Sequence, residues 1–181
     1  MKNIFIGFLL IFLDFNLNIN TSTIGLLPDF VGYIILIKGL DEVASESSIF
    51  LKARPWAVGM SVYSAILYVL DLLGASSGLG FISILLGIIS TIISLYISYV
   101  IVTGVRDIES VRGTKLNGEK LRNIWNIMAI FKLVSYIAFM SQLLALICII
   151  ISFIISIFFL VAFNTTKKLF EGLPPKTNEV S

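Results

Sequence analysis

The stretch from residue 124 to residue 163 is the feature of this sequence that most restricts its fold. It is almost entirely apolar, and Lys132 is its one charged residue. A single α-helix of that length would measure about 60 Å, twice the roughly 30 Å of a bilayer's hydrocarbon core. The polar pair Ser141-Gln142 lies near its middle. We therefore expect two membrane-spanning helices joined by a tight turn at this pair.

Four more apolar runs precede this stretch, at residues 4–17, 24–40, 56–73 and 81–103. Of the 181 residues, 57% are hydrophobic and 13% are charged, whereas soluble proteins carry about 25% charged residues. This composition excludes an ordinary soluble domain and a disordered chain. The sequence predicts an all-α polytopic membrane bundle of six transmembrane helices. Residues 1–166 would form its single domain, and residues 167–181 a short polar cytoplasmic tail.

Basic residues lie on alternate sides of the six expected spans. Residues 18–27, 74–80 and 141–142 contain no Lys or Arg. Because cytoplasmic loops carry an excess of Lys and Arg, we expect both termini in the cytoplasm. The basic residues of the cytoplasmic segments are Lys2, Lys52, Arg54, Arg106, Arg112, Lys115, Lys120, Arg122, Lys167, Lys168 and Lys176.

The first span also has features of a secretory signal peptide, because Lys2 is followed by a short apolar run. No small-x-small cleavage site follows, since Asn18-Ile19-Asn20 is unsuitable. Retention of this span and its removal both remain open, and the other five spans are expected in either case.

The first two spans are short, and the segment between them is unusual. Residues 14–20 alternate polar and apolar side chains, which is typical of extended backbone rather than helix. We expect residues 14–27 to form an ordered outer loop that dips into the bundle. Pro28 followed by Asp29 is a favourable helix start, because proline suits the first helical position and an acid suits the first turn.

Small residues in the fourth span recur at spacings of three and four. Membrane helices associate through such residues, because lipid tails provide no hydrophobic force between helices. The fourth span is therefore predicted to be the central packing helix of the bundle. Its packing face would comprise Gly80, Ser83, Gly87, Ser90, Ser94 and Ser98.

Three aspartates lie near the outer ends of the first three spans, on the small or polar face of each helix. Asp14 aligns with Gly7, Asp29 with Gly32 and Gly39, and Asp71 with Tyr68. We expect these carboxylates to point into the bundle, with Asn16 and Asn18 at the same level. Inward-facing carboxylates in a membrane mark ion, proton or substrate paths. Each also has a structural interpretation, as a helix-start, span-end or loop residue.

Lys132 is the one basic residue placed well inside a predicted span, on the side of Ser135 and Gln142. An isolated ammonium at that depth costs about 2.5–3.5 kcal/mol, so a carboxylate partner is expected. Asp14 is the first choice, provided that the first span extends to about Ile19. Asp29 is the second choice.

Several kinds of chemistry are excluded by residue type. The chain has no histidine and one cysteine, which removes His-based catalysis, intrachain disulfides and zinc sites made of His and Cys clusters. There is no glycine-rich loop for a nucleotide, and no cofactor is predicted. The basic segment 104–122 adjoins two membrane ends, so its expected partners are anionic headgroups of the lipid bilayer rather than nucleic acid. It would also serve as a topology determinant.

Residues 26–40, LLPDFVGYIILIKGL, and residues 50–54, FLKAR, resemble uncharacterised small multi-pass membrane proteins of low-GC Gram-positive bacteria. The resemblance covers residues 24–70. It implies a bacterial cytoplasmic-membrane protein and carries no activity or site residues with it.

Three functions fit these features. The first is a small transport or permeation protein, or an accessory subunit of one, with an acidic outer-facing cavity and Lys132 as internal counter-charge. The second is a non-catalytic membrane interaction protein of the immunity or sensor-partner type, in a homo- or hetero-oligomer. The third is a metal-dependent, lipid-directed enzyme that uses paired carboxylates; it is the weakest, because no two acids lie at a fixed short spacing.

Overall fold

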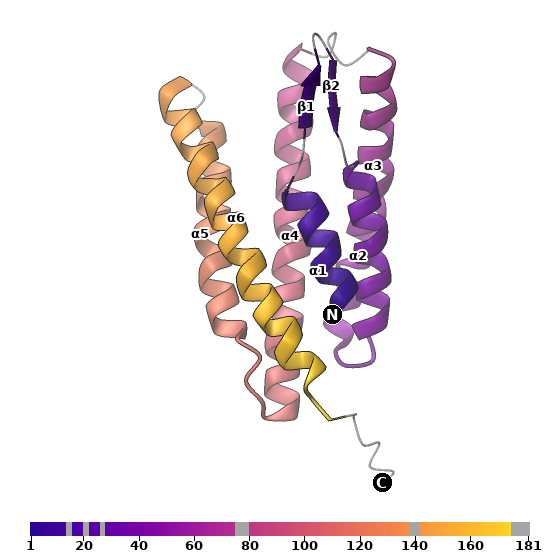
Figure 1. The fold of residues 1–181 in the computed structure, drawn as a ribbon, viewed down its shortest axis with the longest axis vertical. Coiled ribbons are helices and arrows are strands. Elements are labelled where there is room, and N and C mark those ends of the chain that lie inside the picture. The colour runs from indigo at the N-terminus through magenta and orange to yellow at the C-terminus, as the bar shows by residue number, and fades with distance from the viewer. Residues whose placement is uncertain (14–15, 20–21, 26–27, 75–79, 138–141, 175–181) are drawn as a thin grey trace.

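The computed structural model describes residues 1–13, 16–19, 22–25, 28–74, 80–137 and 142–174. These residues form six α-helices, a short 3-10 helix and a β-hairpin (Figure 1). The elements are α1 (Lys2–Phe12), β1 (Asn16–Ile19), β2 (Ser22–Gly25), α2 (Asp29–Val43), η1 (Ser48–Lys52), α3 (Arg54–Leu72), α4 (Gly80–Arg112), α5 (Gly118–Ile137) and α6 (Gln142–Glu171).

Successive helices run in opposite directions, so the start of α1 and the end of α6 lie at the same end of the molecule (Figure 1). We call this the terminal end and the opposite one the hairpin end. Helices α1, α2, α3 and α4 are grouped together, whereas α5 and α6 form a pair that leans away from them at the hairpin end (Figure 1). α5 packs against α4, and α6 packs against α1.

Three helical stretches are long and apolar enough to cross a membrane: Ser48–Leu72, Ile84–Arg112 and Leu146–Glu171. α1 is apolar but shorter. The helical architecture is therefore confirmed, and the length of these three stretches is that of a membrane protein. Crossing of the bilayer by all six helices stays a prediction.

The segment predicted to be extended does form strands. β1 and β2 pair antiparallel, with Asn16 opposite Gly25 and Ile19 opposite Ser22. The first span therefore does not extend to Ile19, because α1 ends at Phe12 and residues 16–19 are already β-strand. α1 and α2 are shorter than the bundle, and the β1–β2 hairpin occupies part of the remaining length (Figure 1). β2 packs against α3.

The closest helix contact is between α1 and α2, and glycines make it possible. A Cβ at Gly39 would lie 2.5 Å from the backbone nitrogen of Ile4, and one at Gly7 would lie 2.9 Å from the Gly32 carbonyl oxygen. No side chain fits at such distances. Gly7, Gly32 and Gly39 therefore let the two backbones approach as small residues do in membrane helix pairs.

Burial is concentrated at the terminal end. There the last part of α4 packs with η1, the start of α5 and the end of α6 around fully buried side chains, which include Phe50, Ile101, Ile108, Leu121 and Phe163. Towards the hairpin end the helices expose large apolar residues such as Leu72, Ile82 and Ile137. An apolar surface of this kind, on helices long enough to span, is the surface that a bilayer covers.

Candidate functional site

Two half-buried charged residues on different helices of the bundle interact electrostatically. Lys132 lies in the second half of α5, and Asp29 is the first residue of α2. The charge of Asp29 acts on the Lys132 ammonium, and Lys132 Nζ lies 4.6 Å from the ring centroid of Phe12, in the last turn of α1. We call Asp29, Lys132 and Phe12 the interior charge site. Three helices that are distant in sequence build it.

The site lies well below the hairpin end, because α2 starts deep in the bundle. Ser61 Oγ donates to the carbonyl oxygen of Phe30 at 3.5 Å, so the start of α2 lies beside Ser61 of α3. α3 continues for 11 residues from Ser61 to Leu72, which is about 16 Å of helix. The prediction that Asp29 lies near the outer end is therefore wrong: it lies at interior depth, because the hairpin and not α2 occupies the outer level.

Hydroxyl groups of α4 continue the polar region away from the charge pair. Ser94 forms a hydrogen bond with the hydroxyl of Tyr33, a buried residue one turn after Asp29 on α2. The charge of Asp29 also acts on Tyr33. Two ionisable groups and two hydroxyls thus meet where α2, α4 and α5 lie together.

Three further side chains of α4 bond to aromatic residues of neighbouring helices. Ser90 bonds with Tyr63 of α3, and Ser98 accepts from Trp125 Nε1 of α5 at 2.9 Å. Thr91 Oγ1 and Tyr136 Oη, also of α5, lie 2.8 Å apart. We call Ser90, Thr91, Ser94 and Ser98 the α4 hydroxyl stripe; its hydrogen bonds join α4 to α2, α3 and α5.

Buried electrostatics determine what this arrangement can do. A charge at membrane depth is costly unless an opposite charge or polar group faces it. The aromatic face of Phe12 stabilises the ammonium through a cation–π contact, worth about 0.5–2 kcal/mol. Asp29 and Lys132 therefore stabilise each other's charged forms, and a change in one changes the charge balance at the other.

The three predicted aspartates are not brought together in one cavity by the described residues. Asp71 is exposed in the last turn of α3, so its predicted inward orientation is wrong. Asp14 lies outside the described residues. Among the described aspartates, Asp29 interacts electrostatically with Lys132; it was the second choice of partner.

The remaining predicted site residues lie around this centre. Tyr68 is half-buried, with its ring centroid 5.8 Å from that of Phe30, the residue after Asp29. Asn16 and Asn18 lie in β1, two residues apart and so on one face of that strand; their side chains are outside the description. Ser135 Oγ donates to the Lys132 carbonyl oxygen at 2.7 Å and fixes the local helix.

The six predicted packing residues fall into three groups. Ser90, Ser94 and Ser98 make the contacts of the hydroxyl stripe described above. Gly87 is not in a tight contact, because a Cβ there would meet only Tyr136 Oη, at an ordinary 3.5 Å. Gly80 begins α4 and Ser83 lies one turn later, but their side chains are outside the description.

Sequence reasoning missed Phe12, Tyr33, Trp125 and Tyr136 as partners of the polar residues. Spacing held a usable signal for two of them: Tyr33 is four residues from Asp29, and Tyr136 is four from Lys132, so each shares a helix face with a charge. Phe12 and Trp125 carried no such signal, because an aromatic residue in an apolar run is most often ordinary core.

The basic segment 104–122 keeps four of its cations exposed, whereas two of its three acids accept hydrogen bonds within the protein and the third, Glu119, is exposed. Glu109 accepts from the backbone N–H groups of Leu116 and Gly118, and Asp107 accepts from the Ser47 hydroxyl. Arg106, Lys115, Lys120 and Arg122 are exposed. The surface at the terminal end therefore presents more positive charge than the sequence count suggests.

Within the described part of the chain, no group of three or more His, Cys, Asp or Glu side chains is placed to hold a metal ion. Comparison with protein-family models, curated proteins and solved structures finds no match to this chain. What the protein does is therefore argued from the interior charge site.

Proposed function

We propose that this chain is an integral protein of a bacterial cytoplasmic membrane, with six spans and both termini in the cytoplasm. Three long apolar helical stretches, the alternating direction of the six helices and the distribution of Lys and Arg support this topology. The exposed basic residues of segment 104–122 then face the anionic headgroups of the inner leaflet. The hairpin end lies on the outer side.

Within that topology we infer that the protein is a small transport or permeation protein, or an accessory subunit of one, for a small cation. The observation that carries this inference is the electrostatic interaction of Asp29 with Lys132, whose ammonium also lies 4.6 Å from the centroid of the Phe12 ring. Ionisable groups at membrane depth are expensive, and where they occur they line ion and proton paths. Oxygen atoms are the ligands that hard cations prefer, and Asp29, Tyr33 and Ser94 provide them side by side.

Lys132 acts in this mechanism as a built-in substitute for the transported cation. When the site is empty of substrate, the ammonium balances the Asp29 carboxylate. When a monovalent cation binds at Asp29, Lys132 releases its proton, so that the site keeps one positive charge in both states. The reaction that this pair supports is therefore exchange of one monovalent cation for one proton.

A second function is favoured by the close packing of α1 and α2. Gly7, Gly32 and Gly39 fix this helix pair at short range, and Asp29 in the first turn of α2 stabilises that helix through its dipole. In a non-catalytic interaction protein, the interior charge site would only set how α5 docks against this pair. The two functions differ in whether any cation moves.

The test is cation-driven proton release in proteoliposomes that contain a pH-sensitive dye. Gradients of Na⁺, K⁺ and a small organic ammonium are applied in turn. We expect at least one of them to drive proton movement in the wild type, and Asp29→Asn and Lys132→Met to abolish it. Asp71→Asn, which changes an exposed aspartate, should retain it. Absence of proton movement with all three cations in the wild type would reject exchange and favour the interaction protein.

A further inference from the structure

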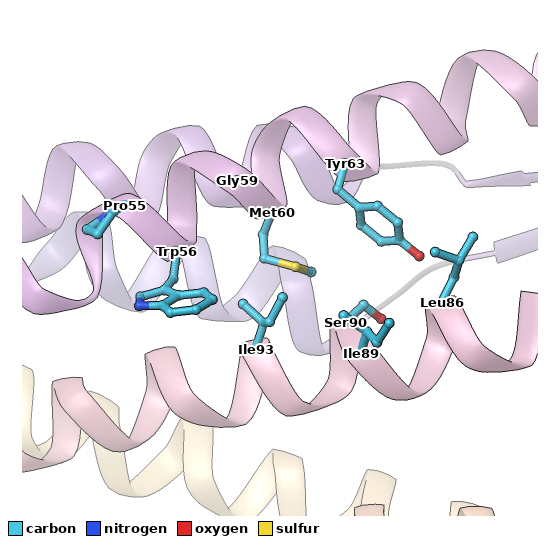
Figure 2. A pocket seen from close by; sticks show the side chains of 9 residues that line it. All are labelled: Pro55, Trp56, Gly59, Met60, Tyr63, Leu86, Ile89, Ser90 and Ile93. Atoms are coloured by element: carbon cyan, nitrogen blue, oxygen red, sulfur yellow. The ribbon is translucent and has the colours of Figure 1, made fainter.

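A groove between α3 and α4 opens on the apolar outer surface of the bundle. Its volume is about 570 Å³, within the range of small-ligand pockets. Figure 2 shows Trp56, Met60 and Tyr63 of α3 on one side and Ile89, Ser90 and Ile93 of α4 on the other. We call this the α3–α4 groove. It is separate from the interior charge site.

The groove is open because one position on α3 has no side chain. Nothing lies within 4 Å of where a Cβ of Gly59 would be, so this glycine faces empty space rather than a neighbouring helix. Met60 is buried and closes the floor, whereas Trp56 and Ile89 are about half exposed along the sides. The lining is apolar except for Tyr63 and Ser90, which bond to each other.

Positive charge lies at one end of the groove. Pro55 and Trp56 form that end, and the exposed residues Lys52 and Arg54 directly precede them. Arg54 uses its Nε atom for an exposed ion pair with Asp41, at 2.8 Å. A surface pair of this kind is weak, and a guanidinium carries further N–H donors on its two Nη atoms.

Aromatic residues mark the same end as the level of the membrane surface. Trp56 and Tyr96 pack edge to face with their ring centroids 5.6 Å apart, and both rings are exposed. Trp and Tyr are enriched where the hydrocarbon core meets the headgroups. From this level the groove runs along α3 to Tyr63, about 10 Å further into the apolar layer.

We propose that the α3–α4 groove binds an anionic phospholipid of the inner leaflet. One acyl chain occupies the groove beside Gly59 and Met60, and the phosphate lies on Lys52 and Arg54. Charge complementarity selects the headgroup, because Asp41 pairs with Arg54 alone and a neutral lipid supplies no further net negative charge to these two cations. This inference rests on the proposed membrane location of the chain. It does not depend on cation exchange at the interior charge site, so the lipid proposal and the exchange proposal can fail separately.

The test uses quenching of Trp56 fluorescence by lipids with brominated acyl chains, since bromine quenches only at short range. The protein is placed in phosphatidylcholine vesicles that contain an equal minor fraction of brominated phosphatidylglycerol or brominated phosphatidylcholine. The Trp56→Phe variant gives the contribution of Trp125, so the difference from the wild type is the Trp56 signal. We expect stronger quenching of Trp56 by the brominated phosphatidylglycerol.

Two sets of variants separate the headgroup site from the groove. Lys52→Gln and Arg54→Gln should each lower the preference for phosphatidylglycerol about fivefold, whereas Lys168→Gln, an exposed change elsewhere at the terminal end, should not. Gly59→Leu fills the groove without a clash and should reduce quenching by both lipids. Val62→Leu, an exposed change on α3 outside the groove, should leave quenching unchanged.

Equal quenching of wild-type Trp56 by the two lipids would overturn the proposal, because no headgroup selection would remain. Unchanged quenching in Gly59→Leu would also overturn it. A Gly59→Cys variant that crosslinks to a second copy of the chain in the same vesicles would assign the groove to a dimer interface instead.

Discussion

Arg112 at the end of α4 and Glu46 after α2 form an ion pair across 66 residues of sequence, with 2.5 Å between Nη2 and Oε2. Arg112 Nε also donates to Glu46 at 3.0 Å, and Nη1 donates to the carbonyl oxygen of Pro174 at 2.8 Å. One guanidinium therefore joins α4 to the loop after α2 and to the residues that follow α6. The pair is largely buried, with side chains 13% and 17% exposed.

We expect Arg112→Gln to lower the free energy of unfolding by about 1.5–3 kcal/mol. The Glu46 carboxylate then loses the guanidinium that donates to it from both Nε and Nη2. Arg54→Gln breaks the Arg54–Asp41 pair, whose side chains are about half exposed. That change should cost less than about 1 kcal/mol, because water screens exposed pairs. Thermal melting of the detergent-purified protein compares the two. Equal losses would show that Arg112 contributes no more than a surface charge.

A second prediction concerns glycines that look alike in the sequence. Gly39→Ala should destabilise the protein by about 1–3 kcal/mol, because its Cβ would lie 2.5 Å from Ile4 N and 2.8 Å from Ile4 Cγ1. Gly87→Ala should be neutral or stabilising by up to about 1 kcal/mol, since alanine favours helix and Gly87 has room for a Cβ. Melting temperatures in one detergent measure both, and the reverse order would contradict the described α1–α2 contact.

The third prediction concerns topology and uses single cysteines on a Cys148→Ser background. Asp71 and Lys115 are both exposed, at opposite ends of the molecule. An impermeant thiol reagent added outside intact cells should label Asp71→Cys and should not label Lys115→Cys. Lys115→Cys should react once the cells are opened. External labelling of Lys115→Cys would contradict the proposed orientation.

Periodicity and composition predicted much of this fold from the sequence. The apolar runs located the helices, the polar alternation at residues 14–20 indicated extended backbone, and Pro28 marked the start of α2. The end of α4 was not predicted. The apolar run stops at residue 103, yet the helix continues to Arg112, because Val105 and Ile108 pack in a buried core at the terminal end.

The candidate site was harder to predict, because residue spacing shows which residues share a helix face but not how close a neighbouring helix lies to that face. Spacing placed Gly39 and Gly87 on small-residue faces alike, but only contacts between helices show that Gly39 is crowded and Gly87 is not. Lys132 predicted a carboxylate partner on physical grounds. Which aspartate reaches it depends on where α1 ends and how deep α2 begins, and both follow from the hairpin between them.

The central claim is that Asp29 and Lys132 form an interior charge pair, and a double-mutant cycle tests it most directly. Thermal stability is measured for Asp29→Asn, Lys132→Met and the double variant in one detergent. Each single change leaves a half-buried charge without its opposite charge, which costs up to about 3–5 kcal/mol, the value for fully buried pairs. The account predicts that the double variant is markedly more stable than the sum of the two losses, because no unpaired charge remains. A double variant as unstable as that sum would contradict the pair, and the cation–proton exchange proposed for it would lose its basis.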